Sequence, residues 1–86
     1  MNKIKADKAY LLVPACLISD EGADIRVNIY DTDYCGIEFD DRVDALIALP
    51  IVTMTFNRIG NGAMAAHIIP RMGSDIIEEL GGATYA

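Results

Sequence analysis

Hydrophobic and polar residues alternate along residues 24–30, which is the clearest strand pattern in the chain. The residues on the apolar side are Ile25, Val27 and Ile29. The alternation resumes at Ile37 and Phe39, after the mainly polar segment 31–34. Two alternating runs around a short polar segment are typical of a β-hairpin. We therefore expect two antiparallel strands with one apolar side and one acidic side that faces water.

Residues 10–18 form an apolar run that is interrupted only by Pro14. The run is shorter than most helices, so it favours a strand that enters the core. Since proline has no backbone N–H to donate, Pro14 places this strand at a sheet edge or at a bulge. Cys16, in the same run, is expected to be a small core residue.

A helical period begins after Asp40. Its apolar residues recur at intervals of three and four, and Asp40 or Asp41 can cap the helix start. These apolar residues are Val43, Leu46 and Ile47. Pro50 cannot donate the next backbone hydrogen bond, so the helix is predicted to end at Leu49. A helix this short is stable only if its apolar residues pack on the sheet.

The Gly-Asn-Gly segment 60–62 lies between two apolar stretches, 51–56 and 63–69. Glycine and asparagine accept the positive φ that hairpin turns require. A three-residue turn would gather the apolar residues of both stretches on one face, and a slip of one residue would turn that set outward. The set is Val52, Met54, Phe56, Met64, Ala66 and Ile68. The sequence therefore predicts a second hairpin, ended by Pro70.

Residues 75–80 are expected to form a final short helix. Ser74 or Asp75 can cap its start, and the glycines at 81 and 82 can end it in the left-handed conformation. Together these elements predict a single α+β domain spanning 1–86. It has a small, mainly antiparallel sheet of four or five strands and two short helices on one face. Residues 83–86 are expected to be flexible.

The hydrophobic content is high for so short a chain, at 52% of 86 residues. A chain of this length buries only about 60% of the surface that its unfolded form exposes, so apolar side chains should remain outside the core. Exposed apolar patches are usually covered in an interface. We therefore expect a homo-oligomer, most simply a two-fold dimer. Its expected interface residues are Val52, Met54, Phe56 and His67.

Negative charge is concentrated in one segment. Nine of the 13 acidic residues lie between residues 20 and 44, where only Arg26 and Arg42 oppose them, so the segment carries a net charge of −7. This charge disfavours nucleic acid as a direct partner and favours a basic protein surface. The expected acidic contacts are Asp31, Asp33, Glu38, Asp40, Asp41 and Asp44. Tyr30 and Tyr34 are the expected aromatic anchors, since binding energy concentrates in such side chains.

No motif for catalysis, a cofactor or a metal is present in the sequence. Segment 31–42 departs from a calcium-binding loop at two essential positions, because Cys35 replaces a ligand and Arg42 replaces the closing glutamate. Cys35 and His67 could supply a thiol and an imidazole, but no local motif places them together. We therefore expect no enzymatic activity, no catalytic residues, no cofactor and no metal.

The preferred hypothesis is a non-enzymatic protein-binding module that presents an acidic surface to a basic partner. A small inhibitor of nucleic-acid-handling machinery, such as a phage-type anti-defence protein that mimics nucleic acid, is one form of it. The simpler alternative is that the acids only keep the domain soluble. A second hypothesis is a self-assembling structural subunit whose apolar sheet face forms a homo-oligomer, and a third is a small enzyme or ligand carrier that uses Cys35 and His67.

The sequence also bears on location. No apolar stretch approaches the length of a membrane span, and residues 1–19 lack the uninterrupted apolar core and cleavage pattern of a signal peptide. The two cysteines do not form a Cys-x-x-Cys pair or a disulfide framework. We therefore expect a cytoplasmic protein with reduced thiols and no membrane partner.

Overall fold

The computed structural model describes residues 4–18, 26–29 and 34–81 and has an α+β architecture with a small antiparallel sheet. The elements in chain order are β1 (Ala9–Pro14), a 3₁₀ turn (Ala15–Leu17), β2 (Arg26–Ile29), β3 (Tyr34–Phe39), α1 (Arg42–Ile59), α2 (Gly62–Ala65), β4 (Ile69–Met72) and α3 (Gly73–Glu79). The strand order is β2-β3-β1-β4, and each neighbouring pair is antiparallel. The coarse prediction of an α+β fold with a small antiparallel sheet is confirmed.

Strand β1 lies inside the sheet, paired with β3 on one side and β4 on the other, and all six of its residues are buried. The prediction of an edge strand was therefore wrong. Pro14 is tolerated because pairing with β4 ends at Leu12, two residues before the proline. The apolar run also does not continue as a strand, since Ala15–Leu17 forms a 3₁₀ turn in which Cys16 is exposed rather than in the core.

The first predicted hairpin is present. Strands β2 and β3 pair in a register that places Arg26 opposite Ile37 and Ile29 opposite Tyr34. Tyr34, which was predicted to lie in the loop between the strands, is instead the first residue of β3, and its side chain packs against a buried cluster. The cluster consists of Ile4, Tyr10, Leu12 and Ile76.

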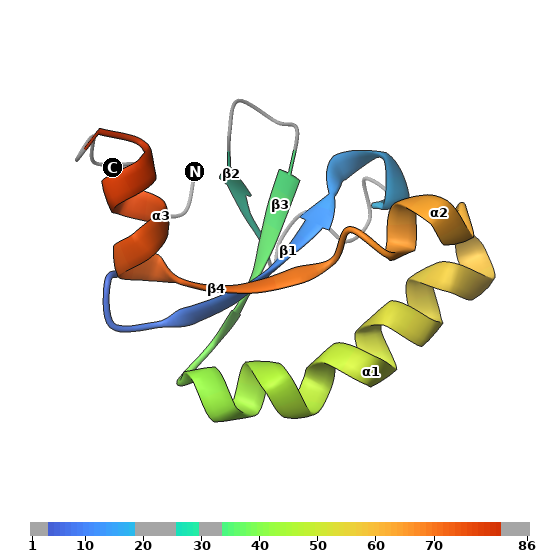
Figure 1. The fold of residues 1–86 in the computed structure, drawn as a ribbon, viewed down its shortest axis with the longest axis horizontal. Coiled ribbons are helices and arrows are strands. Elements are labelled where there is room, and N and C mark those ends of the chain that lie inside the picture. The colour runs from blue at the N-terminus through green and yellow to red at the C-terminus, as the bar shows by residue number, and fades with distance from the viewer. Residues whose placement is uncertain (1–3, 19–25, 30–33, 82–86) are drawn as a thin grey trace.

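Helices cover both faces of the sheet, rather than one face as predicted (Figure 1). The odd-numbered residues of β1 join a core cluster with α1 and α2, and the even-numbered residues Tyr10 and Leu12 pack with Ile76 of α3. This division follows from the alternation of side chains along a strand. A strand that is apolar on both sides requires a covering layer on both sides.

Helix α1 runs through Pro50 and reaches Ile59, so the predicted end at Leu49 was wrong. Its start agrees with the prediction, since the Asp41 side chain accepts a hydrogen bond from the Asp44 backbone N–H at 2.9 Å. The inner side of α1 packs on the sheet core through Ala45, Ala48, Leu49, Val52 and Phe56. These positions keep the helical period on both sides of the proline, and their burial outweighs one missing hydrogen bond.

The predicted second hairpin is absent. Residues 51–59 belong to helix α1 and residues 62–65 form helix α2, so these stretches do not supply the two strands that were expected in the sheet. Segment 60–62 joins α1 to the short helix α2, which the Asn61 side chain caps by accepting from the Ala63 backbone N–H at 2.9 Å. The strand in this region is β4, which begins at Ile69 and contains Pro70 instead of ending before it. Proline is tolerated there because β4 is the last strand in the sheet order.

Helix α3 begins at Gly73, and neither Ser74 nor Asp75 caps it through its side chain. Backbone carbonyls take that role, since the Gly73 and Ser74 N–H groups donate to Lys8 and Ala6 at 2.8 and 3.1 Å. The predicted left-handed glycine stop is present at Gly81, with φ of 76°. The predictions for Gly82 and for residues 83–86 fall outside the described residues.

The continuity of α1 can be tested at Pro50. Alanine at this exposed, mid-helix position would restore the backbone N–H that can donate to the Leu46 carbonyl. We expect Pro50→Ala to raise the free energy of unfolding by about 1–2 kcal/mol in urea titrations and to increase helical circular dichroism. A loss of helical signal would contradict an uninterrupted α1.

The contact between α3 and the start of the chain can be tested at Gly73. A Cβ atom here would collide with the backbone carbonyl of Lys5. We expect Gly73→Ala to lower the free energy of unfolding by about 2–3 kcal/mol. Gly62→Ala is the matched control, because its Cβ would meet only the flexible Asn57 side chain, and it should have little effect. Equal effects of the two substitutions would contradict the close approach.

Candidate functional site

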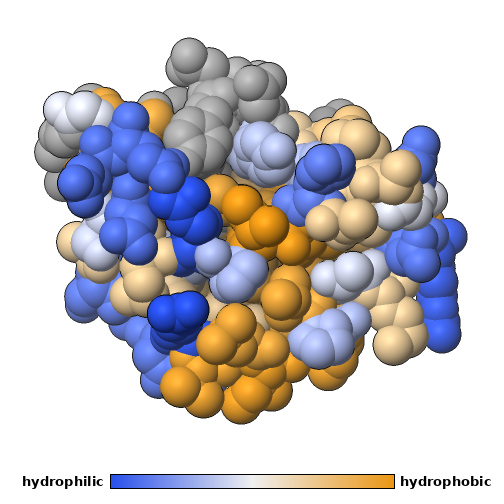
Figure 2. Space-filling model, in the orientation of Figure 1, coloured by the Kyte–Doolittle hydropathy of each residue, from blue (hydrophilic) through white to orange (hydrophobic). Residues whose placement is uncertain are grey.

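The outer face of helix α1 exposes a row of large apolar side chains. We define this outer face by Val43, Leu46, Ile47, Ile51 and Met54, which are 63%, 43%, 66%, 66% and 53% exposed. Figure 2 shows a continuous hydrophobic area along the lower edge of the molecule, where Figure 1 places α1. No described element lies outside α1 on this side (Figure 1). A contiguous exposed apolar patch on a small domain typically marks an interaction site.

The spacing of residues explains why α1 is apolar on two sides. The outer face follows a three-and-four residue spacing from Val43 to Met54, and the inner side follows a second such series from Ala45 to Phe56. The expectation that Val43, Leu46 and Ile47 pack on the sheet was therefore wrong. The signal that could have found the outer face is the presence of two helical stripes in one segment. Only one of them can contact the sheet.

Charged and polar groups lie at the two ends of the outer face. Asp41 caps the helix, Asp44 lies in its first turn and Arg58 lies in its last turn. The Arg58 guanidinium is in contact with the outer face, since its Nη2 lies 3.8 Å from Met54 Sδ. The face therefore has an acidic end and a basic end.

The structure places some of the predicted acidic contacts near the start of α1. Asp40, Asp41 and Asp44 are exposed there, at the acidic end of the outer face. Glu38 lies on β3, and its side chain is only 34% exposed. Asp31, Asp33 and Tyr30 lie outside the described residues.

Lysines of the same chain oppose two of these carboxylates. Lys8 Nζ lies 3.2 Å from Asp40 Oδ1, and Lys5 Nζ lies 3.8 Å from Glu38 Oε2. The hydrogen bond from Lys8 to Asp40 and the charge of Asp40 raise the pKa of Lys8. The carboxylates that the structure describes therefore do not form an uninterrupted row.

A buried phenol connects the sheet to the N-terminal segment. Tyr10 donates a hydrogen bond to Glu38 Oε1 at 3.0 Å and accepts one from the Lys5 backbone N–H at 2.8 Å. Its side chain is fully buried, and this burial, together with the Glu38 carboxylate, raises the pKa of Tyr10 to about 12. The arrangement is a structural contact between β1, β3 and the segment before β1, because a neutral phenol with this pKa has no acid or base role near neutral pH.

The four predicted interface residues are not on one face. Val52 and Phe56 pack inward on the core, Met54 belongs to the outer face, and His67 is exposed in the turn after α2. The grouping was wrong because it assumed the period of a strand, in which residues 52, 54 and 56 share a side. In a helix these residues are 200° apart at each step, so they point to different sides.

The thiol and imidazole groups are not combined into a recognisable catalytic site. Cys35 is buried in β3, whereas His67 is exposed. Within the described residues, no group of three or more His, Cys, Asp or Glu side chains is arranged to hold a metal ion.

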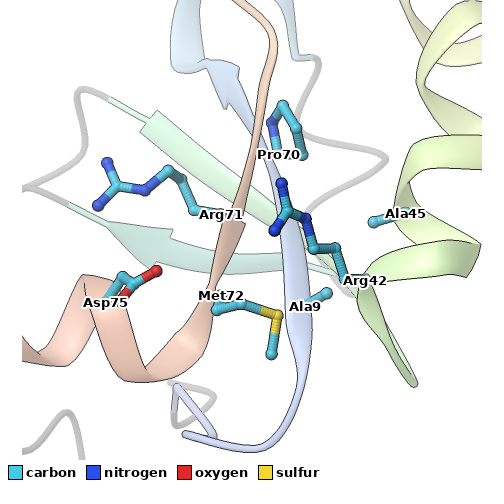
Figure 3. Close-up of a pocket in the computed structure, with 7 residues that line it drawn as sticks. All are labelled: Ala9, Arg42, Ala45, Pro70, Arg71, Met72 and Asp75. Carbon is cyan, nitrogen blue, oxygen red and sulfur yellow. The ribbon is translucent and has the colours of Figure 1, made fainter.

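A small pocket lies between the start of α1, β4 and α3, with a volume of about 230 Å³. Its lining residues are Ala9, Arg42, Ala45, Pro70, Arg71, Met72 and Asp75 (Figure 3). In Figure 3 the Arg71 side chain extends away from Arg42, so the two guanidinium groups do not converge on one ligand position. Arg71 also forms an ion pair with Glu79 of α3. The pocket is smaller than typical ligand sites of roughly 300–1,000 Å³ and lacks convergent polar groups.

Comparisons with known proteins do not identify a family. No protein-family model matches the chain, and no curated protein or solved structure matches it significantly. In the part of the chain that the structure describes, none of the helices combines the length and apolar character needed to span a bilayer. The outer face of α1 is therefore the feature on which a functional interpretation can be built.

The buried phenol of Tyr10 predicts a specific alkaline instability. Its pKa is about 12 in the folded chain and about 10 in the unfolded chain, so its stabilising contribution is complete below about pH 10 and is lost as the pH rises from about 10 to 12. We expect the free energy of unfolding to fall by about 2–3 kcal/mol across this window.

Tyr10→Phe is the control for this prediction. It loses two hydrogen bonds and is less stable near neutral pH, but its stability should fall less steeply between about pH 10 and pH 12, because the group that titrates has been removed. Urea titrations at several pH values measure both slopes. The same slope in the two proteins would show that Tyr10 does not cause the alkaline loss.

Proposed function

We propose that the protein is a non-enzymatic protein-binding module whose contact surface is the outer face of α1. The observation that carries this proposal is the exposure of five large apolar side chains on a helix whose opposite side is already packed on the sheet. In the isolated chain, the exposed parts of Ile47 and Ile51 provide no free energy from burial. Burial of either side chain against a partner would contribute about 1–2 kcal/mol.

The acidic end of the outer face favours a partner that carries positive charge beside an apolar surface. Asp40, Asp41 and Asp44 are exposed where α1 begins. Such rim charges speed the encounter and orient the partner, while the central apolar residues provide most of the binding energy. The partner is therefore expected to present a cation beside an apolar surface, and the apolar residues of α1 rather than the acids supply most of the binding energy.

An inhibitor that mimics nucleic acid is less well supported as the specific form. Such mimicry needs a row of carboxylates at regular intervals, and Lys5 and Lys8 oppose Glu38 and Asp40 within the chain. The self-assembling structural subunit is the second candidate function. The outer face of α1 favours it directly, because an apolar helix face can cover an identical face on another copy.

Substitution on the outer face tests the proposal. The wild-type chain and Ile47→Asp are each immobilised, and proteins retained from a lysate of the native host are compared. We expect Ile47→Asp to reduce retention of the specific partner at least about tenfold, because a carboxylate would have to be buried in the contact.

Ile59→Asp is the matched control. Ile59 is 73% exposed on the same helix, but its position in the last turn is not on the outer face. This variant should retain the partner as the wild-type chain does, and thermal unfolding should show that both variants are folded. Undiminished retention by folded Ile47→Asp would contradict the proposed contact surface.

A further inference from the structure

We infer that the partner of the outer face is a second copy of the chain, joined in a two-fold dimer by antiparallel pairing of the two α1 helices. This inference rests on the proposed function, because it names the molecule that covers the same face. The two observations that carry it are the apolar row itself and the opposite charges at its ends.

The length and position of α1 suit such a pairing. A helix of 18 residues is about 27 Å long, which allows several turns to be in contact. The helix lies along one edge of the molecule, with no described element outside it, so two copies can approach without rearranging the sheet (Figure 1). A two-fold contact also requires one surface that is complementary to itself.

An antiparallel register centred between Pro50 and Ile51 satisfies this requirement. In that register Ile47 of one copy lies across from Met54 of the other. At the centre, Pro50 of one copy lies across from Ile51 of the other. The outer face then covers itself from Ile47 to Met54, and Val43 lies across from Arg58 of the other copy. The Pro50 ring, which is exposed in the isolated chain, would be covered at the centre of the contact.

The charges favour the antiparallel arrangement over the parallel one. Asp44 and Arg58 are fourteen residues apart, nearly four helical turns, so they lie on the same flank of α1 at opposite ends. Antiparallel pairing brings each Asp44 beside the Arg58 of the other copy, which gives two ion pairs. Parallel pairing would instead gather both Asp44 side chains at one end of the contact and both Arg58 side chains at the other, with no pair of opposite charges. The helix dipoles also oppose each other favourably only in the antiparallel pair.

The mass of the 86-residue chain across a dilution series tests the dimer. We expect the wild-type chain to have twice its 9.3 kDa monomer mass at high concentration and to dissociate on dilution. Ile47→Asp should be monomeric throughout the series, while Ile59→Asp should remain dimeric. A monomeric wild-type chain at all concentrations, or a dimer that survives Ile47→Asp, would overturn the inference.

Charge exchange tests the antiparallel register. Asp44→Arg and Arg58→Asp each place like charges together at both ends, so each should raise the dissociation constant about tenfold. The double variant Asp44→Arg, Arg58→Asp should recover wild-type affinity, because the pairs are restored in reverse. An equimolar mixture of the two single variants should also dimerise as tightly as the wild type. Failure of both recoveries would overturn the antiparallel arrangement.

The two proposals can fail separately. If the wild-type chain is monomeric but Ile47→Asp still abolishes retention of another protein, the second copy is the wrong partner and the proposed contact surface stands. If folded Ile47→Asp changes neither the mass nor the retention, both proposals are wrong.

Discussion

The burial of strand β1 on both faces is the constraint on which the rest of the structure depends. Leu11 and Val13 face one side of the sheet, and Tyr10 and Leu12 face the other, and all four are fully or almost fully buried. Each of these side chains contributes about 1.5–3 kcal/mol when it is removed from water. This gain requires a layer on each side, so α1 and α3 cover opposite faces, and β3 and β4 cover the two edges of β1.

The covering layer formed by α1 has an excess of apolar residues. One helix side, from Ala45 to Phe56, is sufficient to cover its face of β1, and Pro50 does not interrupt it because the proline points outward. Figure 1 shows that α1 curves along the sheet, a shape that a proline on the solvent side accommodates. The outer apolar residues lie outside the two core clusters, and we propose that they serve an interaction outside the domain.

The sequence could predict the features whose signal is local and unambiguous. The hairpin of β2 and β3, the cap at Asp41 and the glycine stop at Gly81 were predicted correctly because each depends on local chemistry. Segment 51–59 could not be assigned in this way, since Val52, Met54 and Phe56 alternate with threonines as in a strand, while Val52 and Phe56 also fit a helical period. Pro50 and the Gly-Asn-Gly segment 60–62 then favoured the hairpin. The helix is stabilised instead by the packing of its inner side against β1, which local sequence does not show.

The same ambiguity explains why the candidate site was missed. The prediction placed residues 52, 54 and 56 on one face and so combined an outward residue, Met54, with two core residues. It also assigned Val43, Leu46 and Ile47 to the core, although they are exposed. The acidic contacts were predicted from composition, and three of them, Asp40, Asp41 and Asp44, are exposed where α1 begins. The position and contacts of each carboxylate decide whether it can act on a partner, however. Among the described acids, Asp44 lies beside the apolar row in the first turn of α1, whereas Glu38 accepts a hydrogen bond from Tyr10 and forms an ion pair with Lys5.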